Sequence, residues 1–155
     1  MMVAVHTSYA FRTAEPGDYD TIIAVVDDWW GRPIAGALQR VFLDHFFTTS
    51  LIAEGADGGL AGFLVGFPSP ADDSRAYIHF FGVDPAERGA GLGRSLYETF
   101  FDAMRAGGRT SVHAVTSPVN VDSIAFHRSL GFEVSAPVAD YDGPGADRVV
   151  FSRSL

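Results

Sequence analysis

The sequence contains no cysteine. Disulfide bonds, thiolate ligands for a metal ion and a cysteine nucleophile are therefore excluded. Because disulfides belong to oxidising compartments, a chain without cysteine also fits a cytoplasmic protein, and we expect that location.

Lysine is absent as well, and positive charge is scarce. The 11 basic residues are all arginine and face 19 acidic residues, so the formal net charge is −8. Binding to DNA or RNA needs clustered positive charge, and no nucleic-acid partner is expected. An acidic chain does attract small cationic molecules.

Long hydrophobic runs are missing too. No run approaches the roughly 18 apolar residues of a membrane helix. The N-terminus lacks the charged and then apolar pattern of a signal peptide, so no membrane partner is expected. A hydrophobic fraction of 47% and 13 Phe still allow a sizeable core. The length of 155 residues predicts a single domain over residues 1–155.

The N-terminal part of the chain predicts one strand and two helices. Residues 9–13 alternate as in a strand, and Asp18 is placed to cap the next helix. Apolar residues at helical spacing predict a helix over residues 21–30. A second helix should follow from Pro33, with one apolar face formed by Leu38, Val41, Phe42 and Phe46.

The remainder alternates between strand and helix signals. Residues 50–55 and 60–67 read as a hairpin with its turn at residues 57–59. The further elements are a strand over 76–83, a helix over about 92–104, a strand over 109–117, a helix from about 121 capped by Gly131, and β-type stretches over 133–138 and 148–153. This order predicts an α/β fold with a mixed sheet and right-handed parallel crossovers in its later part.

The most informative stretch is ERGAGLGRSL, residues 87–96, which places Gly89, Gly91 and Gly93 where a helix must begin. A helix N-terminus exposes unpaired backbone N–H groups and the positive end of the helix dipole. Glycine lets a phosphate approach those groups closely. Arg88 and Arg94 would add charge-assisted contacts. The segment therefore suits a diphosphate. The alternative is a tight strand-to-helix connection that binds no ligand, because such a connection can have the same sequence pattern.

Two common phosphate-binding motifs do not fit this stretch. The dinucleotide motif G-x-G-x-x-G, started at Gly91, would need glycine where Leu96 stands. The P-loop fails because Arg94 follows Gly93. The pattern that fits is R-x-x-G-x-G at Arg88, Gly91 and Gly93, directly after the strand ending FFGVDP. It resembles the acetyl-CoA signature of the GNAT N-acetyltransferase superfamily.

A second stretch, NVDSIAFHRSLGFEV at residues 120–134, is similar to the same family's helix-and-strand block. The matching positions are Asn120, Ser123, Phe126, Gly131 and Phe132. In element order the resemblance runs from about Tyr9 to Phe151. It implies a GNAT-type mixed, mostly antiparallel central sheet, splayed at the acetyl-CoA site and flanked by about four helices.

The resemblance also implies how the co-substrate acetyl-CoA binds. It would lie in a wedge between the strand ending at Val83 and the strand over 112–116. Its pantetheine arm would bond to backbone groups of Phe81 and Val83 like an added strand, and its amide would contact Asn120. The diphosphate would sit on the N–H groups of residues 88–94. The implied cofactor residues are Phe81, Val83, Arg88, Gly89, Ala90, Gly91, Gly93, Arg94, Asn120, Ser123 and Phe126.

His127 stands where the family often has a tyrosine that acts as acid toward the departing thiolate. Ser123 and His127 are spaced i, i+4, and Asn120 lies just before them on the same side, so His127 is expected to face the cofactor sulfur. Histidine can donate a proton near neutral pH. Two interpretations stay open: His127 is the acid, or it is a polar residue beside the pantetheine without a proton role.

The general base is expected on the strand over 76–83. Alternation places Tyr77, His79, Phe81 and Val83 on one face, and the strand contains no Asp or Glu. His79 is the best candidate base, acting through a water, and Tyr77 would position the substrate. A structural, half-buried His79 is the alternative. The family geometry suggests the Val83 N–H as oxyanion donor. The histidines show no metal-binding spacing, so no metal site is expected.

The acceptor pocket is expected near the two N-terminal helices and the tail. Trp29 and Trp30 should not both face the same core, so one of them would line the pocket. Asp27 and Asp28 would attract a cationic amine, which aromatic rings can bind by cation–π contact. A buried Trp with a solvated acidic helix end is the alternative. Further candidates for the pocket are Thr116, His45 and Tyr141.

Together these features predict an N-acetyltransferase that moves acetyl from acetyl-CoA directly to a primary amine. A small cationic or aromatic amine is the first candidate acceptor, and a peptide amine is the second. A CoA-binding sensor without turnover and a purely structural module are the alternatives. A homodimer is possible, because relatives in the family frequently dimerise.

Overall fold

The structure is a computed structural model, and it describes residues 9–155. The expectation that the chain begins without a signal peptide falls on residues 1–8, which lie outside the described residues. None of the helices formed by the described residues combines the length and the apolarity that crossing a bilayer requires.

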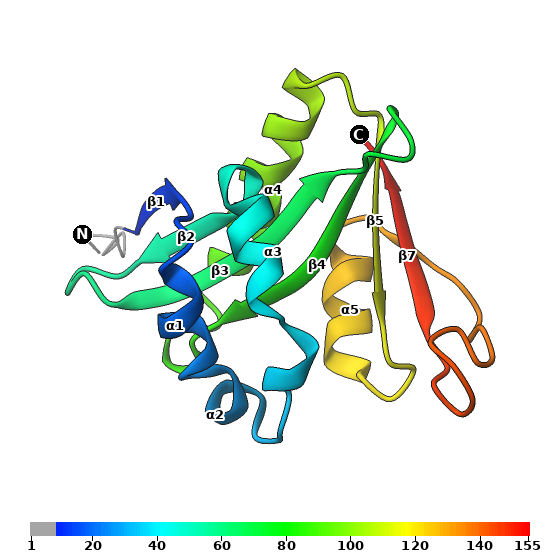
Figure 1. Ribbon diagram of the computed structural model, residues 1–155, viewed down its shortest axis with the longest axis horizontal. Helices are drawn as coiled ribbons and strands as arrows, with labels where there is room; N and C mark the ends of the chain where they lie inside the picture. Colours follow the sequence, from blue (N-terminus) through cyan, green and yellow to red (C-terminus); the bar gives the residue numbers. More distant parts are fainter. Residues whose placement is uncertain (1–8) are drawn as a thin grey trace, which may run out of the picture. The chain divides into compact units, whose positions relative to one another are not determined.

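Within residues 9–155, seven strands form one sheet in the order β1-β2-β3-β4-β5-β7-β6, and most of them are labelled in Figure 1. β4 pairs with β5 in parallel, whereas the β1–β2, β2–β3, β5–β7 and β6–β7 pairs are antiparallel. The strands are β1 Ala10–Thr13, β2 Leu51–Glu54, β3 Leu60–Pro68, β4 Arg75–Val83, β5 Ser111–Thr116, β6 Glu133–Val134 and β7 Val149–Ser154. The expected mixed, mostly antiparallel sheet is confirmed.

Five α-helices are present in residues 9–155, together with three short 3-10 turns. The helices are α1 Asp18–Ile23, α2 Val26–Trp30, α3 Arg40–Phe46, α4 Leu92–Ala106 and α5 Val121–Ser129. The parallel connection from β4 through α4 to β5 is confirmed. The next connection, from β5 through α5 to β6, also joins strands that run in the same direction, because both are antiparallel to β7, which lies between them. The handedness of these connections stays a prediction.

The chain divides into two compact units. The first contains the residues up to Gly66 together with Phe80–Phe100, and the second contains Phe67–His79 together with Phe101–Leu155. The expectation of a single domain stays a prediction.

Both faces of the strands in the first unit are covered by helices. Successive residues of a strand point to opposite faces, as Ile52 and Ala53 do here. Ile52 belongs to a core with residues from α1, α2 and α3, whereas Ala53 packs with Leu92 and Leu96 of α4. The first turns of α4 are therefore anchored directly against this sheet.

The N-terminal helices differ from expectation. The helix predicted over residues 21–30 is two helices, separated at Ala24 and Val25, and the β-branched side chains that surround the break weaken helix formation. The helix expected from Pro33 is a 3-10 turn at Ala35–Ala37, and α3 begins only at Arg40.

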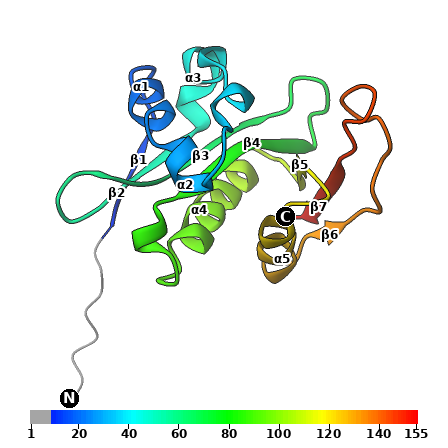
Figure 2. The ribbon, with the colours of Figure 1, turned by 90° about the horizontal axis from the view of Figure 1, so that it is seen from below.

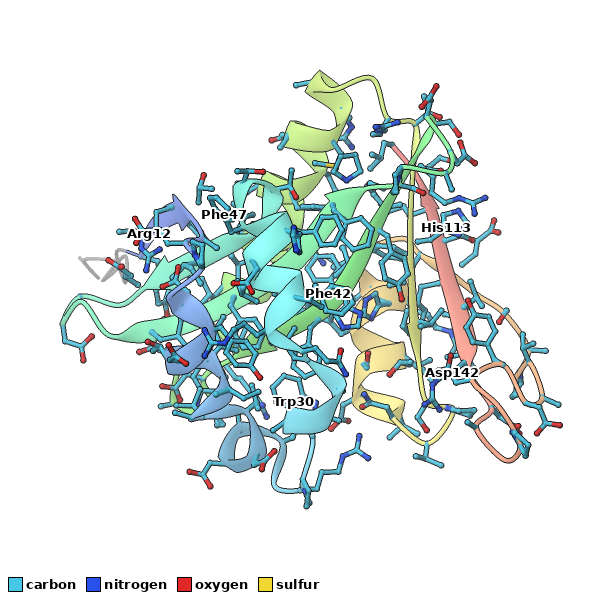
Figure 3. All side chains as sticks on the ribbon, viewed as in Figure 1. Arg12, Trp30, Phe42, Phe47, His113 and Asp142 are labelled. Carbon is cyan, nitrogen blue, oxygen red and sulfur yellow. The ribbon has the colours of Figure 1, made fainter. Side chains whose placement is uncertain are left out.

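Asp18 is not the helix cap, which is Gly17 without a side-chain hydrogen bond. Both carboxylate oxygens of Asp18 accept hydrogen bonds from the Arg12 guanidinium at 2.8 Å, and one also accepts from the Glu15 N–H at 2.7 Å. Arg12, labelled in Figure 3, donates a further bond to Glu54 at 2.7 Å. A two-pronged ion pair is the stronger interaction, so it takes the side chain that would otherwise cap the helix.

The second unit is built around β5 and β7, which pair along their full lengths from Ser111↔Ser154 to Thr116↔Val149. α5 ends as predicted at Gly131, where φ is 84° and the Phe132 N–H donates to the His127 carbonyl at 3.0 Å. β6 is shorter than the stretch predicted over residues 133–138. Beyond it, only an isolated bridge between Val138 and Arg148 is described.

Candidate active site

The glycine-rich turn follows β4 directly. Gly89 and Gly91 have φ values of 87° and 82°, both are exposed, and an added Cβ at either would meet nothing within 4 Å. Only glycine adopts this left-handed backbone without strain. α4 then begins at Leu92, so the predicted start of this helix is confirmed.

The backbone of this turn leaves donors available. The helical ladder starts with the Ser95 N–H, which donates to the Gly91 carbonyl at 3.1 Å. The N–H groups of Leu92 and Gly93 precede that bond and have no intrahelical acceptor, as in any first turn. Together with the helix dipole they form a site that can hold an anion.

The two arginines that flank the turn lie on the surface. Arg88 donates from Nη2 to the Trp29 carbonyl at 3.1 Å, and Arg94 lies 3.9 Å from the Glu98 carboxylate one turn along α4. An exposed ion pair at that distance is weak, so Arg94 can exchange it for another anion.

A hydrogen bond between Tyr9 and Glu87 fixes the residue that precedes Arg88 at the start of the turn, and no sequence pattern indicated this contact. The Tyr9 hydroxyl donates to Glu87 at 2.6 Å, and this hydrogen bond is the main reason that the pKa of Tyr9 is raised. The two residues are 78 positions apart. Local spacing therefore holds no signal that would have joined them.

β4 shows the predicted alternation. Tyr77, His79, Phe81 and Val83 are half-buried, whereas Ala76, Ile78 and Gly82 between them are buried. The Phe81 and Val83 side chains pack on the core below α4, and the Phe81 ring meets Tyr97 edge-on with a centroid distance of 4.8 Å.

The β4–β5 ladder is short in the described chain. It runs from Arg75↔Ser111 to Tyr77↔His113 and stops, although β4 continues to Val83 and β5 to Thr116. The described register between the two strands therefore covers three residue pairs.

Tyr77 keeps its proton near neutral pH, so its hydroxyl can donate a hydrogen bond but cannot act as a base. Its ring lies 5.6 Å from the Phe67 ring and 6.4 Å from the His79 ring, measured between centroids. Burial raises the pKa of Tyr77 to about 12, and the nearby charges of Tyr141 and Asp142 add to the shift. The hydroxyl therefore keeps its proton at pH 7.

His127 is enclosed by aromatic rings. Its imidazole stacks on Phe151 at a centroid distance of 4.0 Å and meets Phe132 and Phe126 edge-on, and the residue is only 5% exposed. The predicted neighbourhood with Ser123 is present: Nδ1 lies 2.7 Å from the Ser123 carbonyl oxygen and 3.4 Å from its hydroxyl.

This environment sets the charge of His127. Burial lowers its pKa to about 4, and the bond to the Ser123 carbonyl only partly offsets the shift. At pH 7 the ring is neutral, and the contact with a carbonyl assigns its proton to Nδ1. Nε2 is then an acceptor. Of the two interpretations, the structure favours a polar residue without a proton role, and the function of His127 stays a prediction.

Asn120 and Thr116 are joined at the end of β5. The Asn120 Nδ2 donates to the Thr116 hydroxyl at 3.2 Å, which ties the strand end to the start of α5. Both are half-buried, and Asn120 makes no side-chain capping bond to its own helix. The carbonyl oxygen of its amide is the end that can accept a bond from a ligand.

The expectation that Trp29 and Trp30 cannot share one core is wrong. Both pack against the same cluster, with ring centroids 6.0 Å and 6.5 Å from that of Phe63, and the Trp30 centroid also lies 5.2 Å from that of Phe80. Trp30 is labelled in Figure 3. One large ring on β3 is wide enough to meet two consecutive helix residues, which point about 100° apart on a 3.6-residue turn.

The other acceptor candidates are dispersed. Asp27 accepts from the Ile34 and Ala35 N–H groups at 2.7 and 2.9 Å, so its carboxylate holds the turn after α2. Asp28 and His45 are exposed, and Tyr141 is 49% exposed. Within residues 9–155 no group of three or more His, Asp or Glu side chains is arranged to hold a metal ion.

Comparison with known proteins identifies relatives of this chain. The sequence model described as the Acetyltransferase (GNAT) family matches residues 8–132. L-2,4-diaminobutyric acid acetyltransferase of Nocardia farcinica is 34% identical over 82 residues, which cover 53% of this chain and 42% of that protein. Streptothricin acetyltransferase of Streptomyces lavendulae is 30% identical over 162 residues, which cover 84% of this chain and 85% of that protein.

Among solved structures, yncA from Salmonella typhimurium, determined with its cofactor acetyl-CoA, has a TM-score of 0.71 at 22% identity. The match covers 96% of this chain and 95% of that one, so the fold is shared throughout. The chain spans less than half the length of the Nocardia relative.

Proposed function

This chain belongs to the acetyltransferase (GNAT) family, and from that premise we propose that it moves an acetyl group from acetyl-CoA to a primary amine. The observation that carries the proposal is the turn at the head of α4. Gly89 and Gly91 adopt φ values that only glycine tolerates, on exposed backbone with open space around it.

The proposed cofactor contacts begin at this turn. The N–H groups of residues 88–94 would hold the diphosphate, and Arg94 would turn from Glu98 toward it. Backbone groups of Phe81 and Val83 would bond to the pantetheine arm. On α5, the amide of Asn120 would meet the pantetheine amide, with Ser123 and Phe126 nearby.

The proposed chemistry is a direct transfer. The neutral amine nitrogen attacks the thioester carbonyl carbon, the C–S bond of the resulting tetrahedral adduct breaks, and CoA leaves as thiol. A free alkyl amine has a pKa near about 10, so a base must take one proton from it. His79 is the proposed base, through a water, and the Val83 N–H is the proposed oxyanion donor. His127 is retained as a positioning residue.

For the acceptor, we propose a small amine that carries positive charge, with an aromatic amine or a peptide amine as further candidates. The net charge of −8 supports the choice, because an acidic surface concentrates cations. The relatives named for diaminobutyric acid and streptothricin support the amine class.

The decisive experiment compares two glycines with the same backbone. Gly91→Ala and Gly58→Ala both place a side chain at a φ near 80° with open space around it, so each should cost similar stability. In the wild type, CoA at 100 times its Kd stabilises by about 2.7 kcal/mol, a rise in Tm of roughly 5–10 °C. We expect Gly58→Ala to keep this rise and Gly91→Ala to lose most of it.

Activity is measured as CoA release with a panel of amines. Amine-dependent release is expected, and His79→Ala should reduce it strongly while leaving the CoA-induced rise in Tm intact. Tight CoA binding without release from any amine would favour a sensor. An equal rise in Tm in Gly91→Ala and Gly58→Ala would remove the basis of the proposed site.

A further inference from the structure

α5 has apolar residues on both of its sides, which a surface helix rarely has. Its inner side carries Phe126, His127 and Leu130 of the core. Its outer side carries Val121, which is 68% exposed, and the more covered Ile124 at the i+3 position. The exposed Asp122 and Ser129 lie on the outer half of the helix as well, so Val121 and Ile124 form an apolar strip beside polar residues.

This outer side is one wall of a groove in the second unit. The opposite wall comes from β6 and the segment after it, with Val134 and Pro137, and Figure 2 shows β6 beside α5. The groove encloses about 320 Å³. This is enough space for a small molecule, and most of the residues that line the groove are apolar.

Two polar side chains face the groove, and only one of them is free to bind. Ser135 donates from its hydroxyl to the Ala136 carbonyl at 2.8 Å and accepts from the Val150 N–H at 2.8 Å. Arg128, one turn beyond Ile124 on α5, lines the groove. Among residues 9–155 its side chain has no ion pair, hydrogen bond or ring contact.

That lack of a partner is unusual within this protein. Nine of the 11 arginines bind a carboxylate, a carbonyl or an aromatic ring within the described chain, and the exceptions are Arg32 and Arg128. The nearest acids in sequence, the exposed Asp122 and Glu133, do not pair with Arg128 in the part of the chain that is described. A guanidinium fork presents two donors in the geometry of a carboxylate.

We propose that this groove binds a small apolar carboxylate, whose hydrocarbon tail lies between α5 and β6 and whose head group pairs with Arg128. The site is separate from the proposed acetyl-CoA residues, which lie elsewhere on α5 and at the head of α4. The proposal does not depend on the transferase activity.

The test uses 4-methylpentanoate as the probe and 4-methylpentanamide as its neutral match. Binding is followed by NMR through the methyl groups of Val121 and Ile124, which is feasible for a chain of 16.6 kDa. The acid should bind saturably with a Kd on the order of millimolar, and the amide at least about tenfold more weakly.

Two variants locate the charge. Arg128→Gln should weaken binding of the acid at least about tenfold, because it removes the charged partner of the carboxylate. Binding of the amide should stay unchanged. Arg32→Gln, at the other unpaired arginine, should change neither. All three proteins should keep the same CoA-induced rise in Tm, so a failure of this site is distinguishable from a failure of the proposed function.

Several results would overturn the proposal. Equal affinity for acid and amide would show that no charge is recognised, and unchanged binding in Arg128→Gln would exclude this arginine. Ala125→Trp, which fills the groove from an exposed position, should abolish binding, and full binding in that variant would place the ligand elsewhere. A dimer seen by sedimentation that buries this face and excludes the acid would identify a second copy as the occupant.

Discussion

At the scale of single residues, surroundings decide which charge a side chain carries. The sequence predicts a role in substrate positioning for Tyr77 and a role near the cofactor sulfur for His127. Burial moves the pKa values of these side chains in opposite directions, to about 12 and about 4. In each case burial favours the neutral form. Near pH 7 the Tyr77 hydroxyl is therefore protonated and can donate a hydrogen bond, and the buried His127 ring is neutral.

The first residue-scale prediction concerns stability against pH. Between pH 6.5 and about 4 the unfolded chain binds a proton on His127 that the folded chain excludes, so the free energy of unfolding falls as the pH falls. The loss approaches about 3 kcal/mol at pH 4, because the pKa falls from 6.5 in the unfolded chain to about 4 in the folded chain. Urea unfolding at several pH values should therefore show that the free energy of unfolding falls less on acidification for His127→Phe than for wild type.

His113 provides an internal reference for that experiment. Its pKa is also lowered, mainly by burial, and it is present in both proteins. The difference between the two curves therefore isolates His127, and parallel curves would contradict a buried neutral ring.

The second residue-scale prediction concerns activity. A group with a pKa of about 4 is protonated in roughly one molecule in a thousand at pH 7, which makes it a poor acid there. We expect His127→Phe, which preserves the stack on Phe151, to reduce kcat less than about tenfold. A loss of a hundredfold or more in a folded variant would restore the acid role.

At the scale of elements, close contact between α2 and β4 explains the tryptophans. Gly82 is buried in β4, and a Cβ there would stand 2.7 Å from the Trp30 ring and 2.9 Å from Phe63. The ring lies on bare backbone, so strand and helix approach more closely than side chains would allow. The half-buried Trp30 is thereby anchored against the core.

This contact predicts that Gly82→Ala destabilises the protein by about 1–3 kcal/mol, the usual cost of overpacking. Gly36→Ala is the matched control, because its added Cβ meets nothing within 4 Å. The free energy of unfolding of both variants is measured in urea. Equal values would mean that α2 moves away without cost and that Trp30 is free to line a pocket.

At the scale of the whole molecule, the net charge of −8 acts on any charged acceptor before it binds. Such a field steers cations and is screened by salt, with a Debye length of about 10 Å at 0.1 M. The effect depends on the sum of charges and does not depend on which unit carries the acceptor.

This predicts that kcat/KM for a doubly positive amine falls several-fold, roughly three- to tenfold, as NaCl rises from about 20 to about 300 mM. A zwitterionic amino acid, which has no net charge, should respond much less and serves as the control. An equal response of both substrates would exclude electrostatic steering.

Much of the fold and part of the candidate site could be predicted from the sequence, because their causes are local. Glycine alone tolerates the backbone at Gly91 and Gly131, so the start of α4 and the end of α5 were predictable. The alternation in β4 and the i, i+4 pair of Ser123 and His127 follow from strand and helix geometry.

Only the tertiary structure decided features that depend on distant neighbours. The sequence alone determined that His127 follows Phe126 on α5, but not that Phe151 of β7 would cover its ring and so disfavour a second proton on it. The sequence also did not predict that both tryptophans contact Phe63 or that Asp18 pairs with Arg12. Desolvation and ion pairing depend on which side chains pack around a residue in the folded protein. Those neighbours are often distant in sequence, so residue spacing along the chain does not predict them.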